Sequence, residues 1–219
     1  MTKSVKKSLK VNFKNNIPSC YSYIRNRKIG VLGGSFNPAH AGHVHISSIA
    51  KKSLGLDEVW WLVSPQNRLK PTIGMETFGK RLNYARILTN KLNYIKVLDL
   101  EEKNKLFASY KTVEFLKNKS RKAKFIWLMG SDILESFNKW LYPSFLTNKI
   151  PVAVIERPGF SNSLMNSNKI QHLGQQIKSS KGRVIFFRSK PVWVFIKRKL
   201  LAISSSEIRN LQTFKNMET

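Results

Sequence analysis

Short apolar runs alternate with amphipathic segments along the chain. Residues 29–34 predict a buried strand that ends in a glycine turn. From Gly42 to Leu54 the apolar residues recur at helical spacing, and Gly55 supplies the stop. Residues 59–63 predict a second buried strand. This order is a βαβ unit, which implies parallel strands joined by a right-handed crossover.

The same alternation continues toward the end of the chain. Further strands are expected at 94–100, 125–129, 152–155 and 184–187. Further helices are expected at 76–91, at 110–118, before the strand at 152–155, near 163–178 and from Ser205. Strands that alternate with helices predict an α/β fold of the Rossmann-like, doubly wound type, with helices on both faces of a parallel sheet.

The charge of the chain is unusual. Lys and Arg number 39 against 12 Asp and Glu, which gives a formal net charge of +27. Such a charge attracts polyanions, including nucleotides and nucleic acid. Lys and Asn are abundant from end to end, so a general compositional bias explains the charge better than a nucleic-acid footprint does.

Residues 1–27 form a basic extension without Asp or Glu, and we expect one folded domain at 28–219. The extension lacks the apolar segment of a secretory signal, and its balance of Lys over Arg argues against a transit peptide. No apolar run is long enough to cross a membrane. The single Cys20 excludes an internal disulfide, which indicates a cytoplasmic protein. The sequence leaves the oligomeric state open.

The loop between the first strand and the first helix holds the densest candidate chemistry. In α/β folds, ligands bind beyond the carboxyl ends of the strands. Glycines let the backbone approach a ligand, and the amino end of the next helix carries partial positive charge. Two histidines three residues apart can donate hydrogen bonds to phosphoryl oxygens. The residues of this predicted phosphate site are Gly33, Gly34, Ser35, Phe36, His40 and His43.

Plainer explanations of these residues stay open. The two glycines can form a simple turn. The histidines can be metal ligands, but no Cys or carboxylate lies close by in sequence to complete a site, so no metal site is expected. One histidine can be a structural residue with satisfied hydrogen bonds. His45 is assigned to that structural class.

Four segments carry a family resemblance. The string Gly-Gly-Ser-Phe-Asn-Pro-Ala-His-Ala-Gly-His at 33–43 resembles the H-x-G-H signature of adenylyl- and cytidylyltransferases. Three further segments are similar to those of nicotinate-nucleotide adenylyltransferases. They are 64–71, 127–132 with Trp140, and 203–209. The resemblance extends over about residues 28–211.

The resemblance implies transfer of the adenylyl group of ATP to the 5′-phosphate of nicotinic acid mononucleotide, in NAD biosynthesis, with Mg²⁺ accompanying ATP. It implies catalytic roles for His40, His43, Lys70 and Arg209. It adds to the ATP site Ser204, Ser205, Ser206, Ile208 and Arg209. It implies an acceptor site formed by Asn37, Thr112, Asp132 and Trp140.

The later segments also make physical sense alone, each with an alternative. The serines at 204–206 can bind phosphates or cap a helix. Lys70 can reach a phosphate as a point charge, although one Lys carries little weight in this chain. Asp132 can accept ribose or amide hydrogen bonds, or cap a helix. Trp140 can stack on a pyridine ring or pack in the core.

The chain departs from the family pattern at three places. Asn37 stands where many members carry Asp, and Ser206 replaces the usual Thr. The 64–71 loop lacks the common P-P-H-K ending and keeps only the Lys. Thr112 lies in a segment similar to the family's Y-T-x-D-T-L segment near the pyridine ring.

Two alternative functions stay open. The first keeps the chemistry and changes the acceptor to nicotinamide mononucleotide, phosphopantetheine or a cytidylyl-transfer substrate. The second is a basic nucleic-acid-binding protein on an α/β scaffold, which predicts steeply salt-dependent binding.

Overall fold

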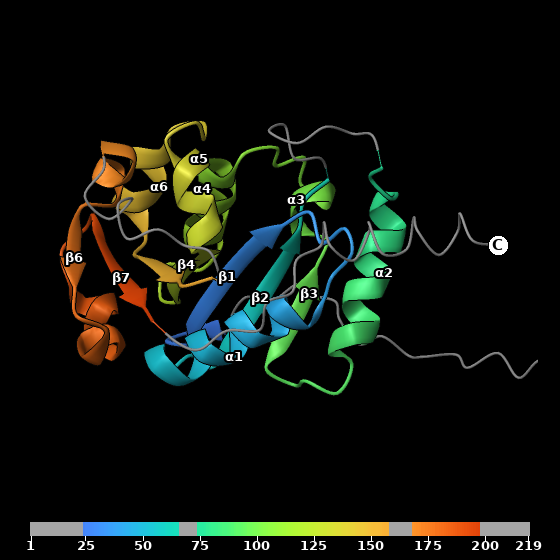
Figure 1. The fold of residues 1–219 in the computed structure, drawn as a ribbon, viewed down its shortest axis with the longest axis horizontal. Helices are drawn as coiled ribbons and strands as arrows, with labels where there is room; N and C mark the ends of the chain where they lie inside the picture. Colours follow the sequence, from blue (N-terminus) through green and yellow to red (C-terminus); the bar gives the residue numbers. More distant parts are fainter. Residues whose placement is uncertain (1–23, 66–73, 158–167, 198–219) are drawn as a thin grey trace, which may run out of the picture.

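A parallel sheet lies at the centre of the fold (Figure 1). The computed structural model describes residues 24–65, 74–157 and 168–197. Within these ranges the strands are β1 (Lys28–Gly34), β2 (Glu58–Val63), β3 (Ile95–Leu98), β4 (Lys124–Gly130), β5 (Val152–Ile155), β6 (Gln175–Ile177) and β7 (Val192–Ile196). They form one sheet in the order β3-β2-β1-β4-β5-β7-β6, with parallel pairing between neighbours. The order reverses between β1 and β4, which is the switch point of a doubly wound fold. The predicted fold class is confirmed.

Helices cover both faces of the sheet. One face carries α1 (Ala41–Leu54), α2 (Phe78–Thr89) and the 3₁₀ helix η5 (Ser179–Phe187). The other carries α3 (Leu100–Lys103), α4 (Ser109–Lys119), α5 (Leu134–Phe137) and α6 (Pro143–Lys149). Short 3₁₀ helices, η2 (Ser131–Ile133) and η4 (Asn168–Leu173), complete the described elements. Leu54, Leu82 and Ile185 belong to the core on the first face, and Val113 and Leu146 to the core on the second.

The loops after β1, β2 and β4 leave the sheet at one level. Gly34 pairs with Val63, and Leu32 pairs with Leu128, so Gly130 lies level with Gly34. The carboxyl ends of parallel strands meet at one edge of the sheet. The register therefore gathers three of the predicted site segments at this carboxyl edge.

The first half of the chain folds as its pattern predicts. β1, α1 and β2 lie where the βαβ unit was expected. Gly55 ends α1 in the left-handed conformation, with φ 64°, and its N–H bonds to the Lys51 carbonyl. The helices expected at 76–91 and 110–118 are α2 and α4. The strand expected at 94–100 ends at Leu98, because Leu100 already begins α3.

The strand predicted at 184–187 is wrong. That run is the end of η5, in which Ile185 is buried while Val184 and Phe187 are 43% and 67% exposed. The strand of this region is β7, whose residues are all buried. Two short apolar runs lie close together here, and periodicity alone does not decide which of them pairs with β5.

The helix predicted near 163–178 is wrong as an α-helix over its described part. Residues 168–173 form the 3₁₀ helix η4, and β6 follows and pairs with β7. Gly174 separates the two with φ 76°, a left-handed conformation that glycine adopts without steric cost. The helix predicted from Ser205 lies outside the described residues.

The packed part of the chain begins before Lys28. Ile24 is fully buried in the core, and the Asn26 N–H donates to the Lys122 carbonyl. Ile24, Asn26 and Arg27, which the sequence assigns to the extension, thus contact the domain. In the part of the chain that the structure describes, no helix is both long and apolar enough to span a membrane.

Candidate active site

The two histidines of the first loop meet at the start of α1. His40 is the N-cap, and its Nδ1 accepts a hydrogen bond from the Gly42 N–H at 3.1 Å. The Nδ1 of His43 accepts from the His40 N–H at 3.2 Å. The two ring centroids lie 3.9 Å apart. This reciprocal pair is a capping box made of histidines, so each ring has a structural role at one nitrogen.

The same hydrogen bonds fix the tautomer of both rings. A neutral imidazole whose Nδ1 accepts a hydrogen bond carries its proton on Nε2. His40 and His43 in their neutral forms are therefore donors at Nε2. Because Nδ1 serves the helix and Nε2 is a donor, the capping role and the predicted phosphate-binding role do not exclude each other.

Phe36 and Trp61 support the loop from the sheet. Their rings stack with centroids 4.9 Å apart and an interplanar angle of 14°. Phe36 has φ 48°, a left-handed conformation that costs a non-glycine residue roughly 1–2 kcal/mol. Burial of its ring, in a residue 2% exposed, offsets that cost. The side chain of Phe36 is therefore a core residue, and its backbone is the part suited to a ligand.

Trp61 is also linked to the histidine pair. Its Nε1 donates to Ser47 Oγ at 2.8 Å, and that hydroxyl donates to the His43 carbonyl at 2.8 Å. Ser47 is fully buried. A buried chain of hydrogen bonds thus connects β2 to the first turn of α1 and fixes its position on the sheet.

Gly33 has a packing reason to be glycine. A Cβ at this position would lie 3.0 Å from the indole of Trp127 on the neighbouring strand. At Gly34 a Cβ would make an ordinary contact of 3.4 Å with the Phe36 ring. The predicted ligand contacts of these two glycines stay predictions.

Asn37 joins the first loop to the segment before α2. Its Nδ2 donates to the Gly74 carbonyl at 3.0 Å, and its Oδ1 accepts from the Glu76 N–H at 3.1 Å. An amide both donates and accepts, whereas an ionised Asp only accepts. Asn37 does both here, which explains why Asn suits this position where many family members carry Asp. The predicted acceptor contact of Asn37 stays a prediction.

Two buried hydroxyls at the carboxyl edge have no hydrogen-bond partner among the described residues. They are Ser35 Oγ, after β1, and Ser64 Oγ, after β2. The two strand ends are linked, since the Ser64 N–H donates to the Gly34 carbonyl at 2.9 Å. A buried polar group left without a partner costs about 1–3 kcal/mol. These hydroxyls are therefore suited to a partner beyond the described residues, such as the oxygens of a ligand.

Asp132 and Arg157 pair across the ends of β4 and β5. Arg157 Nη1 lies 3.2 Å from Asp132 Oδ2, and the carboxylate side chain is 52% exposed. Asp132 caps neither η2 nor α5 through its side chain, so helix capping does not explain it. A Cβ at Gly130 would collide with both side chains, so both would have to shift to admit any other residue there. The exposed carboxylate can accept hydrogen bonds from ribose or an amide.

Trp140 is half-buried. Its indole lies edge-on to Trp127, with centroids 6.1 Å apart, and 5.2 Å from the Phe137 ring. Core packing therefore accounts for part of the side chain. The exposed part is compatible with the predicted stacking on a pyridine ring.

Thr112 points at a buried carboxyl. Its Oγ1 donates to Glu101 Oε1 at 2.8 Å, and Thr112 has no exposed surface. Burial raises the pKa of Glu101 to about 7, and the hydrogen bond from Thr112 opposes that rise. The predicted contact of Thr112 with the acceptor stays a prediction, and its hydroxyl serves Glu101 in this structure.

The other predicted site residues lie outside the described residues. They are Lys70, Ser204, Ser205, Ser206, Ile208 and Arg209. Within the described ranges, no cluster of three or more His, Cys, Asp or Glu could hold a metal ion.

The sequence pattern gave no role to Arg81, which is 1% exposed. Its guanidinium donates to the main-chain carbonyls of Ser35, Ser64, Pro65 and Glu76. One signal was present in the sequence. Arg81 lies four residues before Ala85 and beside Leu82 on the buried face of α2, where a charged side chain requires internal partners.

Comparisons with known proteins decide the family. A family model described as cytidylyltransferase-like matches residues 31–211. A probable nicotinate-nucleotide adenylyltransferase of Agrobacterium fabrum is 36% identical over 183 residues, or 83% of this chain and 97% of that protein. The chain belongs to the nicotinate-nucleotide adenylyltransferase family. This confirms the resemblance drawn from the four segments.

Other members of the family agree with this assignment. A protein of the same name from Rhizobium johnstonii is 33% identical over 195 residues, or 89% of this chain and 98% of that protein. The solved Plasmodium falciparum nicotinic acid mononucleotide adenylyltransferase in complex with NaAD has a TM-score of 0.62 at 21% identity. That match covers 84% of this chain and 83% of the other, and it supports the fold.

Proposed function

We propose that this chain transfers the adenylyl group of ATP to the 5′-phosphate of nicotinic acid mononucleotide, giving nicotinic acid adenine dinucleotide and pyrophosphate in NAD biosynthesis. Family membership supports the reaction. The observation that supports the site is the capping box of His40 and His43 at the amino end of α1, in which each Nδ1 accepts a hydrogen bond, so that each neutral ring is a donor at Nε2.

The attacking group needs no general base. A phosphate monoester has a second pKa of about 6, so it is largely ionised at neutral pH. One of its oxygens forms a bond to the α-phosphorus of ATP, and the bond from that phosphorus to the bridging oxygen of pyrophosphate breaks. The difficulty is to bring two polyanions together. Positioning and charge neutralisation therefore account for catalysis.

The first loop receives the α-phosphoryl group. Backbone N–H groups at 34–36 and the Nε2–H of His43 donate to its oxygens, and His40 assists. The amino end of α1 adds partial positive charge. The buried hydroxyls of Ser35 and Ser64 support an anion here, because they lack acceptors among the described residues.

The β- and γ-phosphates are assigned to Lys70, the serines at 204–206 and Arg209, by resemblance to the family. Mg²⁺ accompanies ATP and neutralises phosphate charge when bound. The described residues offer no carboxylate cluster for a dedicated metal cage. Phosphate oxygens and water are therefore its expected ligands, as is common for Mg²⁺ with nucleotides.

Acceptor binding is assigned in part to the segments that follow β4. Trp140 stacks on the pyridine ring, and Asp132 accepts a hydrogen bond from the nucleotide. Asn37 and Thr112 keep the roles that the resemblance gives them. The single cysteine supports a reducing compartment such as the cytoplasm.

A panel of acceptors tests this function. Pyrophosphate release is measured with ATP and Mg²⁺ and with nicotinic acid mononucleotide, nicotinamide mononucleotide or phosphopantetheine. Release is expected to be highest with nicotinic acid mononucleotide. Release with another acceptor alone would keep the reaction and overturn the substrate. A folded protein that releases none, yet binds RNA with steep salt dependence, would overturn the reaction itself.

A further inference from the structure

A buried cation holds together three loops of the carboxyl edge. Nη1 of Arg81 donates to the Ser35 carbonyl at 2.5 Å and to the Ser64 carbonyl at 2.9 Å. Nη2 donates to the Pro65 carbonyl at 2.8 Å, and Nε to the Glu76 carbonyl at 3.0 Å. The acceptors lie after β1, after β2 and before α2. The planar guanidinium presents five N–H donors in a rigid fork, so a single side chain can serve all four carbonyls.

Stability alone does not explain a cation in this place. Burial lowers the pKa of Arg81, because desolvation disfavours its charged form. Taking a charge out of water costs several kcal/mol, and apolar residues often replace buried ionic groups without loss of stability. A buried cation with four main-chain acceptors is instead suited to fixing the geometry of the loops that it contacts.

The Ser35 contact has a direct consequence for the phosphate site. The Ser35–Phe36 peptide is planar and trans, so the Phe36 N–H points away from the Ser35 carbonyl and from Arg81. A cation on the carbonyl oxygen also polarises the peptide, which strengthens its N–H as a donor. Phe36 is the residue with the left-handed φ of 48°, so this peptide needs support to keep its orientation.

We propose that Arg81 is a positioning residue for adenylyl transfer. It orients the Phe36 N–H toward the α-phosphoryl group by holding the Ser35 carbonyl, and it fixes the 64–65 and 76 segments around the same site. Arg81 acts through the backbone and does not touch the reacting atoms. The catalytic consequence rests on the proposed function. The four hydrogen bonds from Arg81 to main-chain carbonyls, called the clamp below, are independent of the reaction.

Two substitutions on α2 separate the clamp from general effects of charge. Arg81→Lys keeps the charge but replaces the fork by a point donor, which cannot reach four carbonyls at once. Arg86→Lys is the matched control. Arg86 lies on the same helix, is 20% exposed at its side chain, and pairs with Asp99 at 3.7 Å.

Turnover is measured well below the Tm of each protein, so that unfolded molecules do not contribute. Arg81→Lys is expected to lower kcat by about tenfold to a hundredfold, because small misplacements of catalytic groups have effects of this size. The KM values should change far less. Arg86→Lys should retain the wild-type kcat. In Arg81→Ala, methylguanidinium should restore kcat and methylammonium should not.

Hydrogen exchange at the amides of residues 34–36 measures, without any substrate, how firmly Arg81 holds this segment. Exchange should be about tenfold faster or more in Arg81→Lys and unchanged in Arg86→Lys. Unchanged exchange in Arg81→Lys would overturn the clamp, whatever the activity. An active wild type with an equally active Arg81→Lys variant would overturn the catalytic consequence alone. A wild type inactive with every acceptor would instead overturn the proposed function, and the exchange data would still decide the clamp.

Discussion

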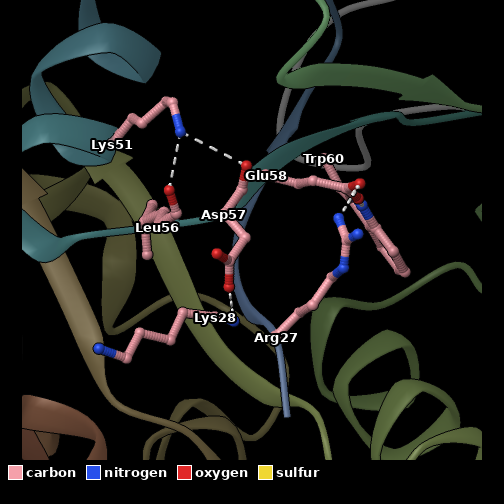
Figure 2. A network of polar contacts seen from close by, with 7 residues as sticks. All are labelled: Arg27, Lys28, Lys51, Leu56, Asp57, Glu58 and Trp60. Carbon is pink, nitrogen blue, oxygen red and sulfur yellow. Dashed lines mark hydrogen bonds and ion pairs between the residues drawn. The ribbon is translucent and has the colours of Figure 1, made fainter. Parts of the chain in front are cut away.

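Polar residues lie at both ends of the paired strands β1 and β2, called the amino edge and the carboxyl edge, but their hydrogen bonding differs between the two. At the amino edge, shown in Figure 2, Glu58 accepts from Arg27 at 2.9 Å and from the Trp60 indole at 2.8 Å. The Lys28 N–H donates to Asp57 Oδ2 at 2.7 Å, and Lys51 Nζ donates to a main-chain carbonyl at 2.9 Å. Donors and acceptors of this network meet within the chain.

At the carboxyl edge, some buried polar groups have no hydrogen-bond partner among the described residues. Ser35 and Ser64 hold buried hydroxyls without partners there, and Phe36 has a left-handed backbone. A satisfied network stabilises the fold, whereas unsatisfied donors and backbone strain gather where a ligand binds. Substitutions at the two edges should therefore separate stability from activity.

The largest expected effect is that of His43→Ala at the carboxyl edge. Loss of one preorganised donor should lower kcat by about 10²–10³. The control is His45→Ala, on the same helix, which should retain turnover. Both are measured by pyrophosphate release with saturating substrates. A His43→Ala protein with near-normal kcat would remove His43 from the mechanism.

A pH effect on stability is expected at Glu101, in the short helix α3 that follows β3. The folded pKa of Glu101 is about 7, against an ordinary value of 4.5. The raised pKa means that its stabilising contribution is complete below pH 4.5 and is lost as pH rises through about 7. The size is about 3–4 kcal/mol at most.

Glu101→Gln isolates this effect, because the amide does not titrate. The Tm of the variant relative to wild type should rise between pH 5 and pH 8 by several degrees. Thermal unfolding over that range measures it. A difference in Tm that stays constant with pH would show that Glu101 titrates normally in the folded protein.

Glu58→Ala tests the amino edge. It leaves the Trp60 indole N–H without its acceptor, which costs about 1–3 kcal/mol. Arg27 is 43% exposed at its side chain and can return to water. Tm should fall by several degrees, while kcat well below Tm stays at the wild-type value. Trp60→Phe removes the orphaned donor, so the double variant should lose less stability than the two single losses added. A large loss of kcat in Glu58→Ala would mean that the two edges are not separable.

A smaller effect is expected for Trp140→Ala. Loss of stacking should raise the KM for nicotinic acid mononucleotide by up to about tenfold, with Trp140→Phe in between. The KM for ATP should not change. Steady-state kinetics with each substrate varied in turn distinguish the two. An equal rise in both KM values would assign Trp140 to the core alone.

The sequence predicted those parts of the molecule that depend on local signals. The first βαβ unit follows from residue periodicity and from Gly55, and the histidine loop from its own spacing. The strand wrongly predicted at 184–187 does not depend on a local signal. Residues 184–187 and β7 are both short apolar runs, and only the pairing of β7 with β5 shows which of them is the strand. Arg81 escaped detection for a similar reason, since three of its four acceptors lie 16, 17 and 46 residues away in the loops after β1 and β2.

Site residues divide in the same way. The capping box joins residues only three positions apart, whereas the packing of Gly33 on Trp127 and the contact of Thr112 with Glu101 depend on the folded chain. The local roles of Gly33 and Thr112 could therefore not be predicted from the sequence.

Transfer of label from ATP distinguishes adenylyl transfer from phosphoryl transfer. The protein is incubated with Mg²⁺, nicotinic acid mononucleotide and ATP labelled with ³²P at the α-phosphate or at the γ-phosphate. Adenylyl transfer puts α-label in the dinucleotide, while γ-label leaves in pyrophosphate. Gamma-label in the acceptor product, or no labelled dinucleotide at all from a folded protein, would contradict it.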